Sequence, residues 1–264
     1  MSNFTIFVLY ENKHSKTTHT NISSPKVVWK ITPLFAEWIS SPTNPLFTHE
    51  TLTNSSSIIE LGCGIAGIVG LLTAPLVSNY VLTDQIYVAK LLEENLASNK
   101  PEPRGKSNTN KQSRPSKQQP KSSHASSSPG GPQIRFHPLD WETDTPTPSL
   151  LTPSSSKSFD AILACDCIYN EALVEPFVST CVEICKFKLQ DPDSPDSPSS
   201  PCIVVVALHL RDPSVFEAFI TALTAKFHVW RVPDSLLVEG LRSSSGFVVH
   251  VGVMKGTIPE PEHP

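Results

Sequence analysis

The sequence lacks several features that would assign it to a specialised class of protein. No apolar run approaches the roughly 20 residues that a membrane-spanning helix needs. None of the six cysteines belongs to a Cys-x-x-Cys pair, and no His/Cys cluster has the spacing of a zinc site. The formal net charge is −4, so no overall basic field favours nucleic acids. We therefore expect no membrane association, no metal site and no direct nucleic-acid binding.

The cysteines and the first residues also bear on the cellular compartment. Most cysteines lie inside apolar runs, which favours buried, reduced thiols in a cytoplasmic or nuclear protein. The apolar start at residues 4–10 is short, has no basic leader and is followed by Glu11 and Asn12. We therefore expect a strand there rather than a signal peptide.

Glycine is scarce, with 11 residues, whereas proline is abundant, with 25. The excess predicts long loops, and residues 101–133 are the clearest case, with Pro, Ser, Lys, Gln, Asn and Gly throughout. This stretch carries six basic residues and one acidic residue and cannot bury enough surface to form a core. It predicts a disordered insert in a surface loop; a basic tether for RNA or a ribosome is the alternative. Two further polar loops cover residues 143–158 and 190–201.

Alternating strand and helix patterns fill the remaining chain. Apolar residues at helical spacing predict helices at 31–39, 68–72, 88–99, 172–187 and 214–225. Short apolar runs predict strands at 58–61, 80–84, 134–137, 159–164, 202–208, 227–232 and 246–254. The alternation predicts a Rossmann-like α/β fold with a mostly parallel sheet, and the last two strands, which no helix separates, suit an antiparallel final pair. One domain over residues 27–255 accounts for the pattern, with 1–26 and 256–264 outside it.

A glycine motif stands between the first of these internal strands and its helix. Glu60-Leu61-Gly62-Cys63-Gly64-Ile65-Ala66-Gly67 has the strand–turn–helix context that a nucleotide-binding G-x-G-x-x-G motif requires. Asp84 ends the next strand, where a carboxylate can accept hydrogen bonds from ribose hydroxyls. Together they predict a nucleoside-containing cofactor, against the alternative of a tight turn without a ligand.

Glu60 distinguishes two classes of cofactor. An NAD enzyme places a pyrophosphate at the helix N-terminus, which an acid two residues before Gly62 would oppose. S-adenosylmethionine has no phosphate, and its ammonium group could bind Glu60 directly or through water. The motif therefore favours S-adenosylmethionine over NAD.

Two further sets of residues follow the third and fourth internal strands. Asp140 and Trp141 are expected at the carboxyl edge near the adenine, against the alternative of a core tryptophan beside a solvated aspartate. Asp166 and Tyr169, three residues apart, can converge on one amine, which Asp166 would orient while it offsets the developing positive charge. Trp29 could cover the cofactor, although an isolated aromatic is more often plain packing.

Several stretches together resemble a known family. These are Glu60 to Gly64, Leu82 to Gln85, Leu139 to Glu142, Ala164 to Asn170, Leu208 to Arg211, His228 to Asp234 and Gly246 to Gly252. They are similar to the seven-strand protein-lysine methyltransferases of the methyltransferase-21-like group, and most similar to the fungal ribosomal lysine N-methyltransferase 5 family. The resemblance covers residues 27–255 apart from the polar loops.

The resemblance implies methylation of a lysine ε-amine in a large-subunit ribosomal protein. It implies that Asp166 and Tyr169 form the Asp-x-x-Tyr signature at the lysine channel. It also implies cofactor contacts from Trp29, Gly62, Cys63, Gly64, Asp84, Trp141, Ala164 and Cys165. A monomer is expected. Alternatives are an NAD-dependent oxidoreductase, a methyltransferase for nucleic-acid or small-molecule amines, and a non-catalytic binding module.

Overall fold

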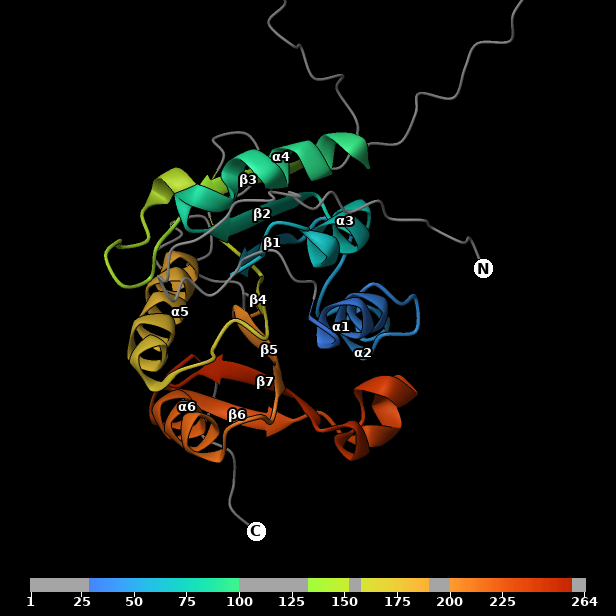
Figure 1. Cartoon of the computed structure of the whole chain (residues 1–264), viewed down its shortest axis with the longest axis vertical. Coiled ribbons are helices and arrows are strands. Elements are labelled where there is room, and N and C mark those ends of the chain that lie inside the picture. The colour runs from blue at the N-terminus through green and yellow to red at the C-terminus, as the bar shows by residue number, and fades with distance from the viewer. Residues whose placement is uncertain (1–28, 100–132, 152–157, 190–199, 258–264) are drawn as a thin grey trace, which may run out of the picture.

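A seven-stranded mixed sheet forms the centre of the structure, a computed structural model that describes residues 29–99, 133–151, 158–189 and 200–257. The strand order is β3-β2-β1-β4-β5-β7-β6, and β7 runs antiparallel to both of its neighbours. The other pairs are parallel (Figure 1). The strands are β1 Ser57–Leu61, β2 Asn79–Asp84, β3 Gln133–Pro138, β4 Ala161–Cys165, β5 Ile203–His209, β6 Phe227–Arg231 and β7 Phe247–Met254. This sheet confirms the predicted α/β fold and its antiparallel final pair.

Helices link the strands and cover both faces of the sheet. The α-helices are α1 Ile31–Ile39, α2 Pro45–Thr48, α3 Ile68–Thr73, α4 Ala89–Ser98, α5 Val174–Leu189 and α6 Pro213–Lys226. The short 3-10 turns are η1 Ala74–Leu76, η2 Ile86–Val88, η3 Pro148–Leu150, η4 Glu171–Leu173, η5 Asp234–Leu236, η6 Glu239–Leu241 and η7 Ser243–Ser245. Five of the α-helices were predicted within a few residues, whereas α2 was not.

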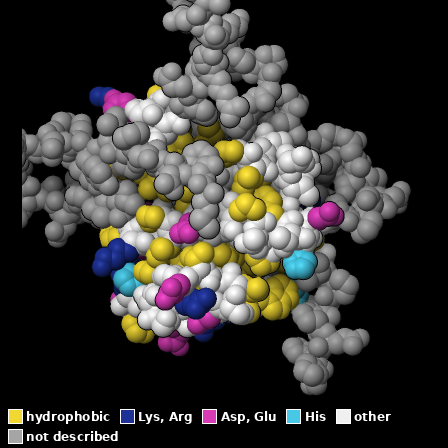
Figure 2. Space-filling view, turned by 90° about the vertical axis from the view of Figure 1, so that its right-hand side faces the viewer, with side chains coloured by type: hydrophobic (Ala, Val, Ile, Leu, Met, Phe, Trp, Pro, Cys, Tyr) yellow, Lys and Arg dark blue, Asp and Glu magenta, His cyan; other side chains and the backbone are white. Residues whose placement is uncertain are grey.

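Two apolar clusters lie on opposite faces of the sheet. Ile58 and Leu163 point into the cluster beneath α1, α3 and α4, whereas Ile59 and Ala164 point into the cluster beneath α5 and α6. The alternation follows from the two-residue period of a strand. Because the central strands are buried on both faces, the sequence shows them as continuous apolar runs. The outer face over α1 and α2 carries few charged side chains among apolar and uncharged ones (Figure 2).

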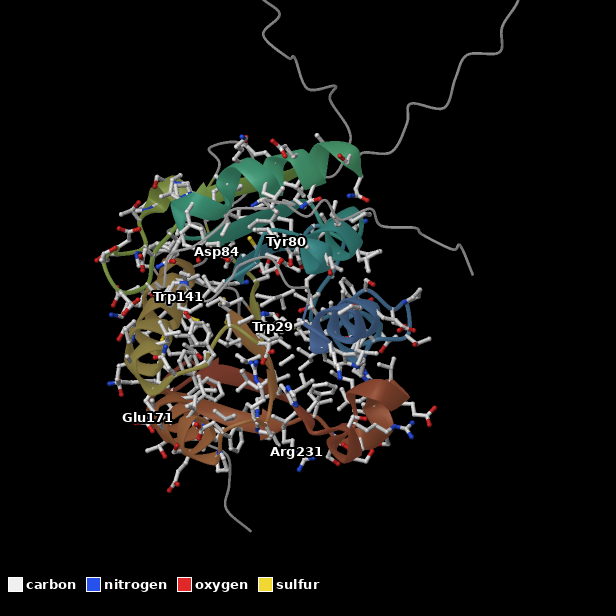
Figure 3. The ribbon with its side chains drawn as sticks, viewed as in Figure 1. Trp29, Tyr80, Asp84, Trp141, Glu171 and Arg231 are labelled. Carbon is white, nitrogen blue, oxygen red and sulfur yellow. The ribbon has the colours of Figure 1, made fainter. Side chains whose placement is uncertain are left out.

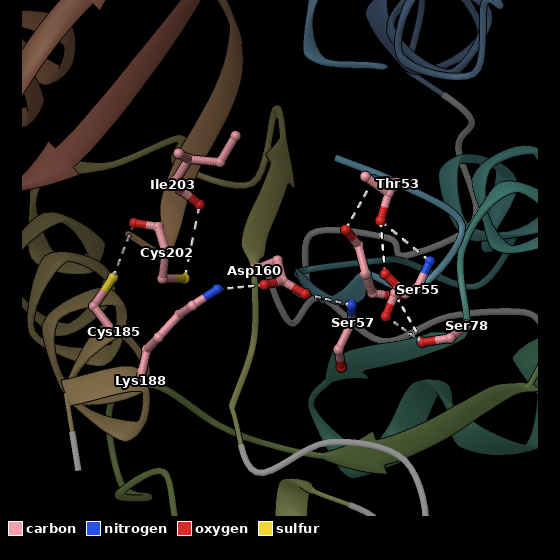
Figure 4. Close-up of polar contacts among 10 residues, drawn as sticks. Thr53, Ser55, Ser57, Ser78, Asp160, Cys185, Lys188, Cys202 and Ile203 are labelled. Carbon is pink, nitrogen blue, oxygen red and sulfur yellow. Dashed lines mark hydrogen bonds and ion pairs between the residues drawn. The ribbon is translucent and has the colours of Figure 1, made fainter. Parts of the chain in front are cut away.

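Asp160 ties the start of β4 to two neighbouring elements. One carboxylate oxygen accepts a hydrogen bond of 2.8 Å from the backbone N–H of Ser57, at the start of β1. The other pairs with the ammonium group of Lys188, near the end of α5 (Figure 4). This contact holds the amino end of the central strands together, at the sheet edge opposite the glycine motif.

Some sequence predictions fall wholly or mostly outside the described residues. The strand expected at 4–10, the insert at 101–133 and most of the loop at 190–201 lie there, so the domain limits stay a prediction. The loop at 143–158 is described up to Leu151 and at Ser158, and its Leu150 is buried in the core. None of the described helices is long and apolar enough to cross a membrane.

Candidate functional site

The glycine motif forms a turn that opens toward a cavity. Gly62 and Gly64 have φ angles of +71° and +64°, in the left-handed region that favours glycine. A Cβ on Gly62 would lie 2.6 Å from the Cβ of Cys167, so no side chain fits there. A Cβ on Gly64 would meet no atom within 4 Å. The turn is therefore packed closely against the chain after β4 on one side and open on the other.

The cavity beside this turn has a volume of about 410 Å³. It lies at the carboxyl ends of β1, β2 and β4, where a doubly wound sheet binds its ligands. Eleven of the twelve site residues predicted from the sequence line it: Trp29, Glu60, Gly62, Cys63, Gly64, Asp84, Asp140, Trp141, Cys165, Asp166 and Tyr169. In Figure 3, Asp84, Trp141 and Trp29 come together from separate parts of the chain, whereas Glu171 and Arg231 lie lower in the view.

Ala164 is the predicted site residue that does not line the cavity. Its side chain is fully buried in the apolar cluster beneath α5 and α6. Its neighbour Cys165 points to the other face and reaches the cavity, because successive strand residues alternate. Any contact from Ala164 to a ligand would have to come from its backbone.

Asp84 is held at the end of β2 by backbone groups. Its carboxylate oxygens accept hydrogen bonds from the backbone N–H groups of Gly64 and Gln85, each at 2.8 Å. Burial raises the pKa of Asp84 above its ordinary value, although these two hydrogen bonds oppose that shift. Asp84 is half-buried and lines the cavity, and each carboxylate oxygen accepts one hydrogen bond and keeps a further lone pair, so Asp84 can also accept from a hydroxyl donor there.

Glu60 is buried at the inner end of the cavity. The Tyr80 hydroxyl donates a 2.8 Å hydrogen bond to its carboxylate. Desolvation raises the pKa of Glu60 to about 8, above an ordinary value near 4.5. The group is therefore mainly protonated at neutral pH in the absence of a cation, and its proposed contact with an ammonium stays a prediction.

Trp141 and Asp140 form the wall that follows β3. The indole packs edge-on against Phe177, with ring centroids 5.3 Å apart. Its buried Nε1 has no hydrogen-bond partner among the described residues, which is uncommon for a buried donor. Asp140 accepts a 2.8 Å hydrogen bond from the side-chain amide of Gln85. The wall therefore offers a positioned carboxylate beside an indole whose Nε1 is enclosed by the protein.

Asp166 follows β4 in a constrained conformation. Its φ angle is +53°, which is unusual for a residue other than glycine, and its backbone N–H donates to the carbonyl oxygen of Ala207. One carboxylate oxygen pairs with Arg211 at 2.8 Å and accepts from the backbone N–H of His209 at 3.2 Å. Burial raises the pKa of Asp166, and the Arg211 charge opposes that rise. Asp166 is therefore already partly compensated by a cation.

Arg211 is the main site residue that sequence reasoning missed. Its guanidinium carbon lies 4.8 Å from the centroid of the Trp29 ring, so Arg211 joins Asp166 to Trp29. Its place just after β5 was the signal in the sequence, because parallel strands end at a common edge. Gln85 and Tyr87 also line the cavity and were not predicted as site residues.

The cysteines of the cavity are not ionised, and the described side chains form no metal site. Burial raises the pKa of the Cys63 and Cys165 thiols well above the ordinary value, so both stay neutral and serve as apolar lining. Within the described ranges, no group of three or more His, Cys, Asp or Glu side chains is arranged to hold a metal ion. All six cysteines are free, and five are buried.

Comparisons with known proteins agree with this geometry. The sequence profile of a lysine methyltransferase family matches residues 12–113 and 124–190. The chain is 26% identical to ribosomal lysine N-methyltransferase 5 of Candida glabrata, covering 81% of this chain and 67% of that protein. It is 28% identical to the protein of the same name from Zygosaccharomyces rouxii, covering 86% of this chain and 72% of the relative.

Proposed function

The chain belongs to the lysine methyltransferase family, and from that premise we propose that it methylates a lysine of a large-subunit ribosomal protein. The observation that supports this most is a single cavity that brings Asp84 and Trp141 together with Asp166 and Tyr169. The names of the relatives support a ribosomal protein as the substrate.

Three features of the cavity fit S-adenosylmethionine, the cofactor of this enzyme class. The Asp84 carboxylate suits the ribose hydroxyls, and Trp141 lines the cavity near the expected adenine position. The open side of Gly64 leaves room for the cofactor against the backbone. When bound, the cofactor supplies a methyl group on a positively charged sulfur.

The remaining residues would bind the substrate lysine. A lysine amine has a reference pKa of about 10.4, so it must lose a proton before it can attack. Asp166 would attract and orient the amine and then stabilise the methylated cation. The positive charge of Arg211 would lower the pKa of a lysine amine beside Asp166, because like charges disfavour the protonated form. Tyr169, which is 57% exposed, would narrow the entrance to a slim alkyl chain.

The alternatives can be separated by ligand binding. An NAD enzyme would place a pyrophosphate at the glycine turn, near the buried Glu60 carboxyl, which would then stay protonated. Calorimetry should show binding of S-adenosylhomocysteine and none of NAD. Methylation of a nucleic acid is separated by the identity of the labelled product.

The decisive experiment is methyl labelling of cell lysates. Lysates from cells without the gene are incubated with the purified protein and S-adenosylmethionine carrying a tritiated methyl group. We expect one labelled large-subunit ribosomal protein, with the label on a lysine by mass spectrometry. Label in RNA, or in no protein although S-adenosylhomocysteine binds, would contradict the proposal.

We further propose that the protein acts as a monomer in the cytoplasm or nucleus, without direct membrane or nucleic-acid binding. Its six free cysteines suit a reducing compartment. Light scattering of the purified chain checks the oligomeric state, and fluorescence microscopy of a tagged chain checks the compartment.

A further inference from the structure

A second cavity, of about 180 Å³, adjoins the first at the carboxyl end of β5. Its apolar wall comes from Ile168, Leu208, Val215, Phe216 and Phe219. Nothing in the chemistry assigned to the first cavity uses these residues. A cavity of about 150 Å³ lined by apolar side chains can hold a benzene molecule, so this space is large enough for one aliphatic or aromatic side chain.

Tyr169 and Arg211 line both cavities. Arg211 is the residue that pairs with Asp166, and Tyr169 is the aromatic residue at the expected lysine entrance. A polypeptide that inserts a lysine beside Asp166 can therefore extend over the second cavity.

The spacing of an extended chain suggests which substrate residue reaches it. Side chains at positions i and i+2 of a strand point to the same side and lie about 7 Å apart, from a rise of roughly 3.3 Å per residue. A residue two positions from the lysine thus points the same way as the lysine itself.

We propose that the second cavity binds an apolar side chain of the protein substrate, two positions from the methylated lysine. The proposal rests on the lysine methyltransferase function proposed above and adds a rule for substrate choice. The cofactor cavity admits any lysine that reaches Asp166, whereas the second cavity selects lysines with an apolar neighbour on the same side of the chain.

The first test maps the modified lysine. The lysine labelled in the lysate is located by mass spectrometry, and a peptide of fifteen residues centred on it is synthesised. We expect a leucine-sized or larger apolar residue two positions before or after the lysine. Replacing that residue with serine should lower kcat/KM at least about tenfold, the usual discrimination of an apolar pocket.

The second test fills the cavity. Val215 is half-buried and borders the open space, so Val215→Phe should occupy it while leaving the fold intact. This variant should lose the preference for the apolar peptide over its serine form, a loss that a double-mutant cycle measures. Glu217→Gln is the matched control, because Glu217 is exposed on α6 and does not line the cavity.

Binding of S-adenosylhomocysteine shows whether each variant still has an intact cofactor site, so that loss of the peptide preference can be told from loss of the fold. If Val215→Phe fails to bind it, Phe216→Ala replaces that variant and should favour a peptide with a larger apolar side chain. A mapped lysine with polar residues at both positions would overturn the subsite alone, as would an unchanged peptide preference in a variant that binds the ligand. Absence of any labelled lysine would overturn the proposed function and the subsite with it.

Discussion

The two halves of the main cavity hold their acidic groups in different ways. On the side of β1 and β2, Asp84 accepts from two backbone N–H groups, and Glu60 accepts from a tyrosine hydroxyl. On the side of β4 and β5, Asp166 pairs with the side chain of Arg211, which in turn lies over Trp29. The proposed cofactor half, on the side of β1 and β2, has no paired cation among the described residues, whereas the proposed substrate half, on the side of β4 and β5, has one.

The two halves therefore differ in how easily mutation moves their carboxylates. The position of Asp84 is set by hydrogen bonds from the backbone, and most substitutions outside the glycine turn leave the backbone in place. A carboxylate held by an arginine depends on a side chain that is about one-third exposed and can be replaced or displaced. We therefore expect mutations in the cofactor half to change affinity and those in the substrate half to change turnover and its pH dependence.

The largest effect is expected from Asp166→Asn. The amide keeps the size of the side chain but removes the charge, which leaves Arg211 uncompensated where the lysine must enter. Turnover should fall about a hundredfold or more, the usual cost of a lost electrostatic contact at a reacting centre. Single-turnover methylation measures the fall, and calorimetry should show nearly unchanged S-adenosylhomocysteine binding. Glu171→Gln, an exposed change outside the cavity, is the control. A wild-type rate would make Asp166 only a turn residue.

Asp84→Ala should weaken cofactor binding in the other half of the cavity. The change removes acceptors for two ribose hydrogen bonds, each worth roughly 1.5–3 kcal/mol, so cofactor affinity should fall at least tenfold. Calorimetry with S-adenosylhomocysteine measures the loss, and circular dichroism shows whether the fold persists. As a control, Glu93→Ala, at an exposed position of α4, should leave the affinity for S-adenosylhomocysteine unchanged. Equal affinities for both variants would remove Asp84 from the cofactor site.

Arg211→Gln should change the pH dependence of the methylation rate, which tests the role of the paired cation in the proposed substrate half. Without the guanidinium, the substrate lysine loses a nearby like charge that lowers its pKa, and the pKa of Asp166 rises further. Both changes should move the rise in rate toward higher pH and lower the rate several-fold at neutral pH. A pH profile of single-turnover rates tests this, and Arg211→Lys should restore the wild-type profile. A uniform fall at every pH would indicate a packing role only.

Glu60→Gln tests the neutral acid of the cofactor half. Because the folded pKa of Glu60 is raised to about 8, the folded state binds a proton that the unfolded state releases near pH 4.5. The wild-type protein should therefore lose stability, relative to Glu60→Gln, as the pH rises from about 4.5 to 8, by a few kcal/mol. Urea unfolding at several pH values measures the difference. Parallel stability curves would show that Glu60 titrates normally.

The smallest effect is expected from deleting residues 103–131 and bridging them with a short Gly/Ser linker. No predicted core residue is lost, so the melting temperature should stay within a few degrees. Differential scanning calorimetry provides the comparison with the full chain. A large fall would mean that the segment packs against the domain.

The sequence predicted most of the fold because the central strands and their helices carry strong periodic patterns. The ends of elements were harder to place. The helix expected from residue 172 begins at Val174, because Asn170 caps a 3-10 turn at Glu171–Leu173. The final strand begins at Phe247 rather than Gly246, whose φ of +78° ends the preceding turn. The helix α2 was missed, although Asn44 before Pro45 is a readable capping signal.

The candidate site was predictable where one motif supplied it and less so where distant residues meet. The turn at Gly62 to Gly64 and the acid at Asp84 belong to one local strand–turn–helix unit and the next strand. The partner of Asp166 is 45 residues away. The position of Arg211 just after β5 places it at the same edge of the sheet, but neither stretch shows that the two side chains pair. The Tyr80 hydroxyl on Glu60 was equally hidden, because it depends on the register between β1 and β2.

The position of β7 has a consequence for how the chain is made. This strand pairs with β5 from Ile203↔Val253 to His209↔Phe247 and with β6 from Phe227↔Met254 to Arg231↔His250. A growing polypeptide therefore leaves one long edge of β5, and both edges of β6, unpaired until β7 leaves the ribosome exit tunnel. Unpaired edges of this kind invite association with other chains. A premature stop between residues 212 and 246 should yield an aggregating product rather than a smaller enzyme, even though every residue of the main cavity has already been synthesised.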